Sequence, residues 1–203
     1  RFYDATQGTV LVDGVDVRDY TFDALYDRLG YVTQKAVLFS GTVQDNIFFG
    51  QSEAADTDET LQQALQLSQA AEFVDRYPEK AAHPIAQLGR NVSGGQKQRL
   101  SIARALARRP EILIFDDSFS ALDYKTDATL REGLAKQLPG TTKIIVAQRI
   151  STIRNADQIL VLDRGEIAGL GTHDALMASC PVYREIAMSQ LSEEELKKGG
   201  VSK

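Results

Sequence analysis

Residues 112–117 have the sequence Ile-Leu-Ile-Phe-Asp-Asp, a continuous apolar run that ends in two carboxylates. A run that is apolar at every position is typical of a strand buried on both faces of a parallel sheet. Two further apolar runs follow at residues 143–147 and 159–162, and residues 125–138 supply a crossover helix between the first two runs. The sequence therefore predicts an α/β fold built on a parallel sheet.

Other elements are expected from turn residues and from the spacing of apolar side chains. In chain order they are a hairpin at residues 9–17 around Asp13-Gly14, a short strand at 29–33, one helix over 58–77 that stops at Pro78, a second helix from about 95 to 109, a hairpin from 159–162 into 166–168, and a final amphipathic helix around Tyr183.

Composition excludes several classes of protein. The chain has 203 residues, of which 43% are apolar and 25% charged, enough for one hydrophobic core without disulfides or a structural metal. The single cysteine, Cys180, excludes a disulfide framework. The net charge of -5 argues against a general nucleic-acid binder. No apolar run approaches the ~18 residues of a membrane-spanning helix.

Residues 92–99, Val-Ser-Gly-Gly-Gln-Lys-Gln-Arg, open the second predicted helix. Ser93 and Gln96 have the spacing of a capping box, and Gly94 and Gly95 let a ligand or another backbone come close. The free N–H groups at a helix start attract anions, phosphate above all. Alone, Ser93-Gly94-Gly95 favours a well-capped helix and nothing more. Because a strand ending in two aspartates follows, where open α/β sheets bind ligands, we favour a phosphate site.

In combination these motifs resemble the nucleotide-binding domain of ABC transporters over residues 1–190. The stretches that carry the resemblance are the signature-like Val92-Ser93-Gly94-Gly95-Gln96, the Walker B-like strand 112–116, the D-loop-like Ser120-Ala121-Leu122-Asp123, the Q-loop-like Gln34 after Tyr31-Val32-Thr33, and residues 149–165 after the switch loop. Residues 38–47 resemble the segment that follows the Q-loop in exporters, whose ATPase is fused behind membrane helices.

The resemblance implies a P-loop NTPase core with a parallel sheet, an antiparallel β portion and a helical subdomain inserted at about residues 41–109. It assigns residues 1–191 to the ATP-binding domain and 192–203 to a polar tail. It also implies ATP and Mg²⁺ as cofactors, with Gln34 and Asp116 serving the metal. The residues implied to contact the nucleotide are Gln34, Ser93, Gly94, Gly95, Gln96, Asp116 and Asp123.

Three departures from the family pattern qualify this resemblance. The printed sequence holds no G-x-x-x-x-G-K-[ST] loop, so we expect that it starts just after Walker A and that the isolated fragment is inactive. Asp117 stands where catalytic members carry a Glu that orients the attacking water. Gln148 stands where the switch-loop His is expected, and Gln cannot carry a positive charge. Asp117 and Gln148 therefore occupy the hydrolytic positions of a degenerate site.

Family members with such a site work as heterodimers, in which each ATP lies between one chain's Walker motifs and the other chain's signature. The resemblance thus implies an ATP-driven bacterial exporter of the multidrug type, with a transmembrane domain fused upstream and with this domain on the cytoplasmic face of the membrane. The alternative is a soluble ABC ATPase that acts on DNA or ribosomes, against which residues 38–47 speak.

Four arginines lie along the helix that follows the signature: Arg99, Arg104, Arg108 and Arg109. We expect them to form a solvated face with some long-range attraction for ATP, rather than a nucleic-acid patch, because the chain is acidic overall.

Overall fold

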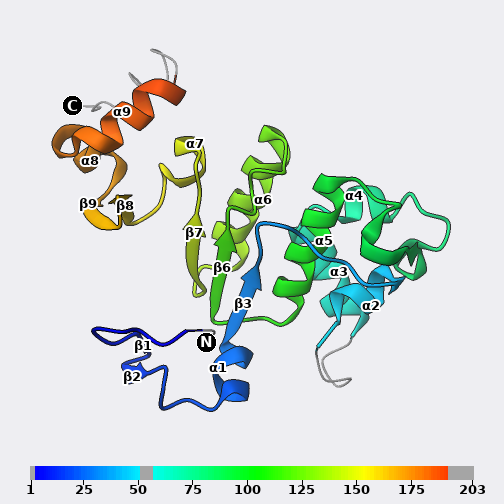
Figure 1. Cartoon of the computed structure of the whole chain (residues 1–203). Coiled ribbons are helices and arrows are strands. Elements are labelled where there is room, and N and C mark those ends of the chain that lie inside the picture. The colour runs from blue at the N-terminus through cyan, green and yellow to red at the C-terminus, as the bar shows by residue number, and fades with distance from the viewer. Residues whose placement is uncertain (1–2, 51–56, 192–203) are drawn as a thin grey trace. The chain divides into compact units, whose positions relative to one another are not determined.

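The computed structural model describes residues 3–50 and 57–191, and the chain divides between Val146 and Ala147 into two compact units, each described separately below (Figure 1). Within the described part of the chain, no helix combines the length and the apolar character needed to cross a membrane.

A three-stranded parallel sheet in the order β3-β6-β7 is the centre of the first unit (Figure 1). Its strands are β3 (Leu29–Val32), β6 (Ile112–Asp116) and β7 (Thr142–Val146). Helix α6 (Tyr124–Gln137) makes the crossover from β6 to β7. The parallel pairing of the first two apolar runs and the crossover helix are confirmed. The addition of β3 to this sheet was not expected from the sequence.

The third apolar run does not join the parallel sheet, so that expectation was wrong. Strand β8 (Ile159–Asp163) lies in the second unit and pairs antiparallel with β9 (Glu166–Gly171). The turn between them places Arg164 at φ 51° and Gly165 at φ 84°, as a tight hairpin requires. Alternate residues of β8 are exposed, so this run is apolar without being buried on both faces. The predicted hairpin itself is confirmed.

Short elements precede the sheet in the first unit. Strands β1 (Leu11–Val12) and β2 (Val15–Asp16) form the predicted hairpin, with Asp13 and Gly14 both at positive φ. Helix α1 (Phe22–Arg28) then begins after Thr21, whose side chain accepts a hydrogen bond from the N–H of Ala24. This cap starts α1, and β3 begins directly after the helix ends at Arg28.

The segment between β3 and β6 is mainly helical. Its elements are β4 (Gly41–Thr42), α2 (Val43–Ile47), α3 (Asp58–Leu67), α4 (Ala71–Val74), the 3-10 helix η2 (Lys80–Ala82), β5 (Pro84–Ile85), the 3-10 helix η3 (Gln87–Gly89) and α5 (Gly94–Ala107). Strands β4 and β5 pair antiparallel. Helix α5 confirms the predicted second helix.

The single helix expected over residues 58–77 is wrong, because the chain breaks between α3 and α4. Gln69 adopts φ 61°, in the left-handed region, which ends α3. The Ser68 hydroxyl donates to the carbonyl of Leu65 and accepts from the N–H of Ala70. Ser competes in this way for backbone groups that a continuous helix would use. The apolar face was correctly predicted, since both helices turn buried residues to the core.

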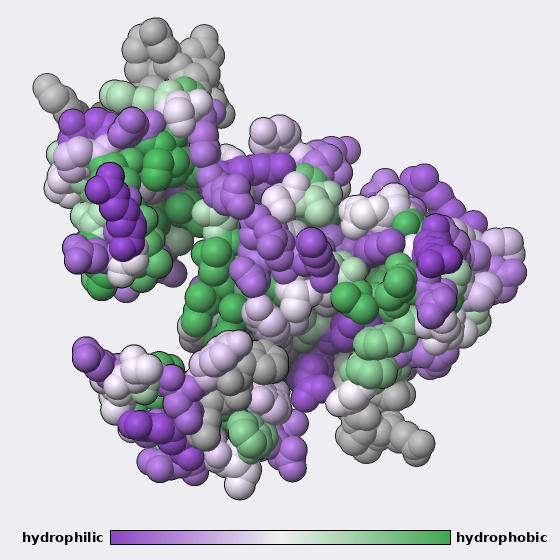
Figure 2. All heavy atoms as spheres, in the orientation of Figure 1, coloured by the Kyte–Doolittle hydropathy of each residue, from purple (hydrophilic) through white to green (hydrophobic). Residues whose placement is uncertain are grey.

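One core covers a single face of the parallel sheet. Buried Leu113 and Phe115 of β6 pack in the same cluster as Leu100 of α5 and Leu130 of α6. Residues on the opposite face of the strands remain exposed, among them Ile144 at 49% and Val146 at 53%, and Figure 2 shows apolar surface over β7.

The arginines of α5 do not form the solvated face that we expected. Three of the four are only partly exposed and bind main-chain oxygens of neighbouring segments, which a periodicity argument cannot detect. These oxygens belong to Gln69 for Arg99, to Val37 and Asn46 for Arg104, and to Gly50 for Arg108. Arg109 donates to the side chain of Thr60.

In the described part of the second unit, three helices share a hydrophobic core with the hairpin. They are α7 (Ile150–Ile153), α8 (His173–Ser179) and α9 (Pro181–Gln190). Tyr183 of α9 is buried, and its hydroxyl lies 2.8 Å from Nδ1 of His173. The final amphipathic helix is therefore confirmed. The tail predicted at residues 192–203 lies outside the described residues.

Candidate functional site

The first candidate site lies at the carboxyl edge of β3 and β6. The two strands are parallel and in register, with Val32 opposite Phe115. The residues that follow each strand therefore emerge side by side. The Tyr31 hydroxyl donates a 2.9 Å hydrogen bond to Oδ2 of Asp116. This bond raises the pKa of Tyr31 above its ordinary value, aided by partial burial and by the charge of Asp116.

Gln34 and Asp117 meet at this edge although they are far apart in sequence. Nε2 of Gln34 donates to Oδ2 of Asp117 over 3.2 Å. Asp117 is 9% exposed, and its own N–H donates to the carbonyl of Val146 over 2.9 Å. The structure thus brings together Gln34, Asp116 and Asp117, three of the residues that the sequence assigned to one site.

Asp117 adopts a left-handed backbone conformation, with φ 46°. Asp enters this region more readily than most residues because its short side chain can bond nearby backbone groups. Glu lacks that advantage, so the backbone at this position suits the residue that is present. Sparsely populated backbone conformations recur at functional sites, so the conformation of Asp117 supports the hypothesis that this residue has a functional role.

The loop that follows Asp117 is fixed by hydroxyl groups. The Ser118 hydroxyl, which is buried, donates to the carbonyl of Val32 over 2.9 Å. The Ser120 hydroxyl donates to the carbonyl of Asp117 over 2.7 Å. These bonds tie the loop to the end of β3 and to the turn at Asp117.

Asp123 ends this loop and caps α6. Its carboxylate accepts from the N–H of Thr126 over 3.0 Å and from the Thr126 hydroxyl over 2.7 Å. Both bonds hold the pKa of Asp123 below its ordinary value, the backbone bond most strongly. The nucleotide contact that the resemblance implies for Asp123 stays a prediction.

The second candidate site is the start of α5. The capping box is confirmed: the Ser93 hydroxyl accepts from the N–H of Gln96 over 3.3 Å, and Oε1 of Gln96 accepts from the N–H of Ser93 over 2.8 Å. A Cβ atom at Gly94 would meet no heavy atom within 4 Å, whereas one at Gly95 would lie 3.4 Å from the carbonyl oxygen of Ala121. The helix start is therefore open to an approaching anion on the Gly94 side.

Gln148 belongs to the second unit, whereas Asp117 belongs to the first. Within its unit, the carbonyl of Gln148 accepts a 2.8 Å hydrogen bond from Nε2 of Gln190. The shared site predicted for Gln148 and Asp117 stays a prediction from the sequence.

The residues at the strand edge fit a magnesium ion that is bound together with a nucleotide. Mg²⁺ in phosphate-transferring proteins is held by one or two protein oxygens together with phosphates and water. Asp116 supplies a carboxylate, and Gln34 retains its amide oxygen while its amide nitrogen bonds Asp117. Within residues 3–50 and 57–191, no group of three or more His, Cys, Asp or Glu side chains gathers as a metal centre.

Sequence reasoning missed two contributors to these sites. Tyr31 was noted only as part of a strand, yet its hydroxyl bonds Asp116. Gln98 was noted only as part of the signature helix, yet its side chain is 2% exposed and bonds the carbonyl of Thr33. Both contacts depend on which segments lie next to each other, which one sequence does not reveal.

Comparison with known families gives one match that covers more than half of the chain. Residues 1–120 match the family described as ABC transporter. The described strand edge and the first residues of the loop after β6 fall within this match, as does the start of α5.

Similar proteins come from several organisms. An uncharacterized ABC transporter ATP-binding protein of Mycobacterium tuberculosis is 48% identical over 94% of this chain. The ATP-dependent lipid A-core flippase of Syntrophus aciditrophicus is 39% identical over 97% of the chain. Multidrug resistance protein 1 of Entamoeba histolytica is 41% identical over 97% of the chain. The chain spans 32% of the length of the first two relatives and 15% of the third.

A solved structure described as a bacterial Atm1-family ABC exporter with ATP bound is similar in fold as well. It matches with a TM-score of 0.89 and 37% sequence identity, over 95% of this chain and 34% of that chain. The fold similarity therefore extends beyond residue 120, where the family match ends.

Proposed function

The chain belongs to the ABC transporter family, with the P-loop NTPase fold of its ATP-binding domain, and we propose that it is the ATP-binding part of an exporter that couples ATP binding and hydrolysis to transport across a membrane. The observation that carries this proposal is the hydrogen bond between Gln34 and Asp117. It joins the loop after β3 to the end of β6, which bears Asp116. These are the positions that the family motif assigns to metal and water.

In this proposal Asp116 and Gln34 hold Mg²⁺ in the chain's own ATP site, and the start of α5 contacts the phosphates of the ATP in a partner's site. When bound, ATP would supply the scissile phosphoanhydride bond, and Mg²⁺ would offset the negative charge of the ATP phosphates. The oxygen ligands of the strand edge and the open N–H groups beside Gly94 support these roles.

We further propose that the chain works as one half of a heterodimer. Its signature, residues 93–96, completes the partner's ATP site, whereas its own site hydrolyses ATP poorly. Two substitutions support this division. Asp117 is one methylene shorter than Glu, and a misplacement of about 1 Å can slow a reaction on the order of 10²-fold. Gln148 cannot become a cation, unlike the His expected there.

The proposed partners are a second ABC nucleotide-binding domain and a membrane-spanning domain, which would place this chain at the cytoplasmic face of a membrane. The relatives named as a flippase and a multidrug resistance protein support transport. A soluble ABC ATPase that acts on DNA or ribosomes is less well supported, because residues 38–47 have the exporter pattern and the similar solved structure is an exporter.

The assembled transporter tests the proposal. ATP turnover is measured with Asp117→Asn in this chain and, separately, with Glu→Gln at the equivalent position of the partner. We expect the partner's substitution to abolish turnover and Asp117→Asn to leave most of it. Equal loss from both substitutions would contradict the division of labour, and absence of ATP turnover in the unaltered assembly would contradict the proposed function as a whole.

A further inference from the structure

Two side chains of α5 hold both ends of the segment that carries Gln34. Nε2 of Gln98 donates to the carbonyl of Thr33 over 3.2 Å. Nη1 of Arg104 donates to the carbonyl of Val37 over 3.0 Å. Residues 34–36 lie between these two attachment points. The Gln34 loop is therefore fastened at both ends to the helix that begins with the signature.

The first attachment is a buried one. The Gln98 side chain is 2% exposed, and buried amide groups are rarely left without hydrogen-bond partners. Its bond to Thr33 acts on the residue directly before Gln34. An apolar side chain of similar length would fit the same space without making that bond.

The second attachment is broader because the guanidinium of Arg104 reaches several acceptors at once. Besides Val37, it binds the carbonyl of Asn46 over 2.7 Å and Oδ1 of the same residue over 3.1 Å. Its charged group also lies over the rings of Phe39 and Phe49, at 5.4 and 5.7 Å from their centroids. A planar guanidinium makes such multiple contacts, and a lysine ammonium does not.

Asn46 extends this attachment back into the loop. Its Oδ1 accepts from the N–H of Phe39 over 2.8 Å, and its Nδ2 donates to the carbonyl of Phe39 over 2.9 Å. The ring of Phe39 also stacks on Phe49, with centroids 4.2 Å apart. The chain from Val37 to Asn46 is thus attached to α5 through Arg104.

We propose that Gln98 and Arg104 are positioning residues that make the Gln34 loop move together with the signature helix. A displacement of α5 then changes the distance between Gln34 and Asp117, whose bond is the contact between this loop and the strand edge. A signature that engages a partner's nucleotide would in this way adjust Gln34 in its own chain. This inference rests on the proposed function, since it assigns Gln34 to the nucleotide site.

The side-chain amide of Gln34 is the direct readout of this positioning. We would record its ¹⁵N NMR signals in the whole chain for two variants. Gln98→Met keeps the side-chain length, Arg104→Met keeps part of the aliphatic stem, and both remove the hydrogen bonds. We expect the Gln34 signals to shift toward those of a glutamine whose side-chain amide lacks the hydrogen bond to Asp117.

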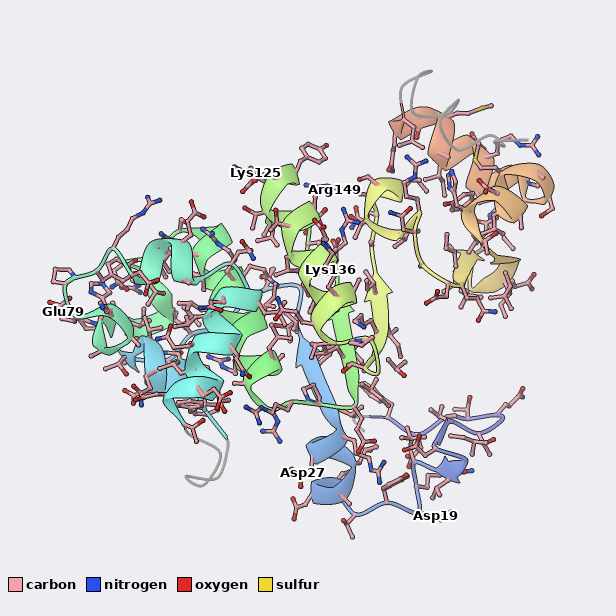
Figure 3. The ribbon with its side chains drawn as sticks, turned by 180° about the vertical axis from the view of Figure 1, so that it is seen from behind. Asp19, Asp27, Glu79, Lys125, Lys136 and Arg149 are labelled. Carbon is pink, nitrogen blue, oxygen red and sulfur yellow. The ribbon has the colours of Figure 1, made fainter. Side chains whose placement is uncertain are left out.

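Arg108→Met is the matched control. Arg108 follows the last residue of α5 and binds the carbonyl of Gly50 and the carboxylate of Asp27, a residue of α1 that Figure 3 labels. Arg108→Met removes the hydrogen bonds to Gly50 and Asp27, which lie outside the Gln34 loop, so the Gln34 signals should not shift. Unchanged Gln34 signals in both test variants, or equal shifts in the control, would overturn the proposal. Arg104→Lys should resemble Arg104→Met, because the charge alone does not rebuild the attachment.

A second measurement separates positioning from mere stability. In the assembled transporter with the partner's own site inactivated, Gln98→Met and Arg104→Met should lower the remaining kcat for ATP several-fold. They should change KM less than kcat, because they displace Gln34 but leave the signature and Asp116 in place. A rise in KM with unchanged kcat would overturn the proposed role. If the unaltered transporter hydrolyses no ATP, the proposed function fails, whereas the NMR test of the attachment can still be decided on the chain itself.

Discussion

The start of α5 and the carboxyl edge of β3 and β6 gather the motif residues of this chain, and they are built in opposite ways. At the start of α5 the backbone is open: Gly94 has no neighbour within 4 Å of a Cβ position, and the capping box uses Ser93 and Gln96 alone. At the strand edge the side chains bind one another, through Tyr31 to Asp116 and Gln34 to Asp117.

This difference separates an open backbone surface from a group of side chains that are held by their own contacts. The open helix start matches the family signature. The strand edge, where side chains bind one another, departs from the family pattern at Asp117. A division of labour between two ATP sites would produce this contrast, because one region serves another chain and the other serves this chain.

The largest expected effect comes from placing an acidic side chain at the open start of α5. Gly94→Asp should fit sterically, and an acidic side chain in the first turn of a helix is favourable for folding. The added charge would nevertheless repel a phosphate. We expect ATP turnover of the assembled transporter to fall about 10²-fold or more, the usual result of spoiling a preorganised anion site. Ala128→Asp on the exposed side of α6 adds the same charge elsewhere and should leave turnover unchanged.

The next effect comes from repairing the strand edge. Asp117→Glu combined with Gln148→His restores the residues that the family pattern expects. Turnover at the chain's own site should then rise by up to about 10²-fold, since one methylene of reach is regained. The measurement is ATP turnover with the partner's own site inactivated. The exposed pair Asp58→Glu with Gln62→His is the control. If ATP turnover did not rise in this double variant, Asp117 and Gln148 would not be the cause of poor hydrolysis at the chain's own site.

A smaller effect tests the capping box as a structural device. Ser93→Ala should lower the free energy of unfolding of the first unit by about 1 kcal/mol, the usual loss on removing a helix cap. Ser93→Gly should lower it by only a few tenths of that amount, because Gly is accepted at this position. Urea unfolding followed by circular dichroism measures both variants. Equal losses would mean that Ser93 does not act as a cap.

The two regions also differ in how much of them the sequence could predict. The capping box at Ser93 and Gln96 is local, since three residues of spacing determine it, and the structure confirms it. The run of β6 and the crossover helix α6 are equally local. By contrast, the bond from Tyr31 to Asp116 requires β3 to pair with β6, which no local pattern reveals.

Errors of prediction have the same physical origin. The helix expected over residues 58–77 broke at Gln69, because a serine bonded to nearby backbone outweighed apolar periodicity. The arginines of α5 and of the two residues after it were expected in solvent. Their sequence positions show a row of charges but do not show which distant segments these charges bind. Arg104 instead binds carbonyls of Val37 and Asn46. The local structure of the motifs was therefore more predictable than the contacts that position them.

The smallest expected effect concerns the titration of Tyr31, which probes the closed region directly. Its pKa is raised above the ordinary 10.0, first by the hydrogen bond to Asp116 and then by burial and charge. The folded chain thus keeps this proton to a higher pH than the unfolded chain. The stabilising contribution is complete below about pH 10 and is lost as the pH rises through the folded pKa.

Asp116→Asn should bring the pKa of Tyr31 back toward its ordinary value, because the charged acceptor is removed. The ¹³Cζ chemical shift of Tyr31, followed against pH, measures this change, and Asp27→Asn on α1 serves as a control away from the strand edge. If the Tyr31 titration were the same in all three proteins, the contact with Asp116 would not persist in solution. The strand edge would then be as open as the start of α5, and the structural contrast between the two regions would disappear.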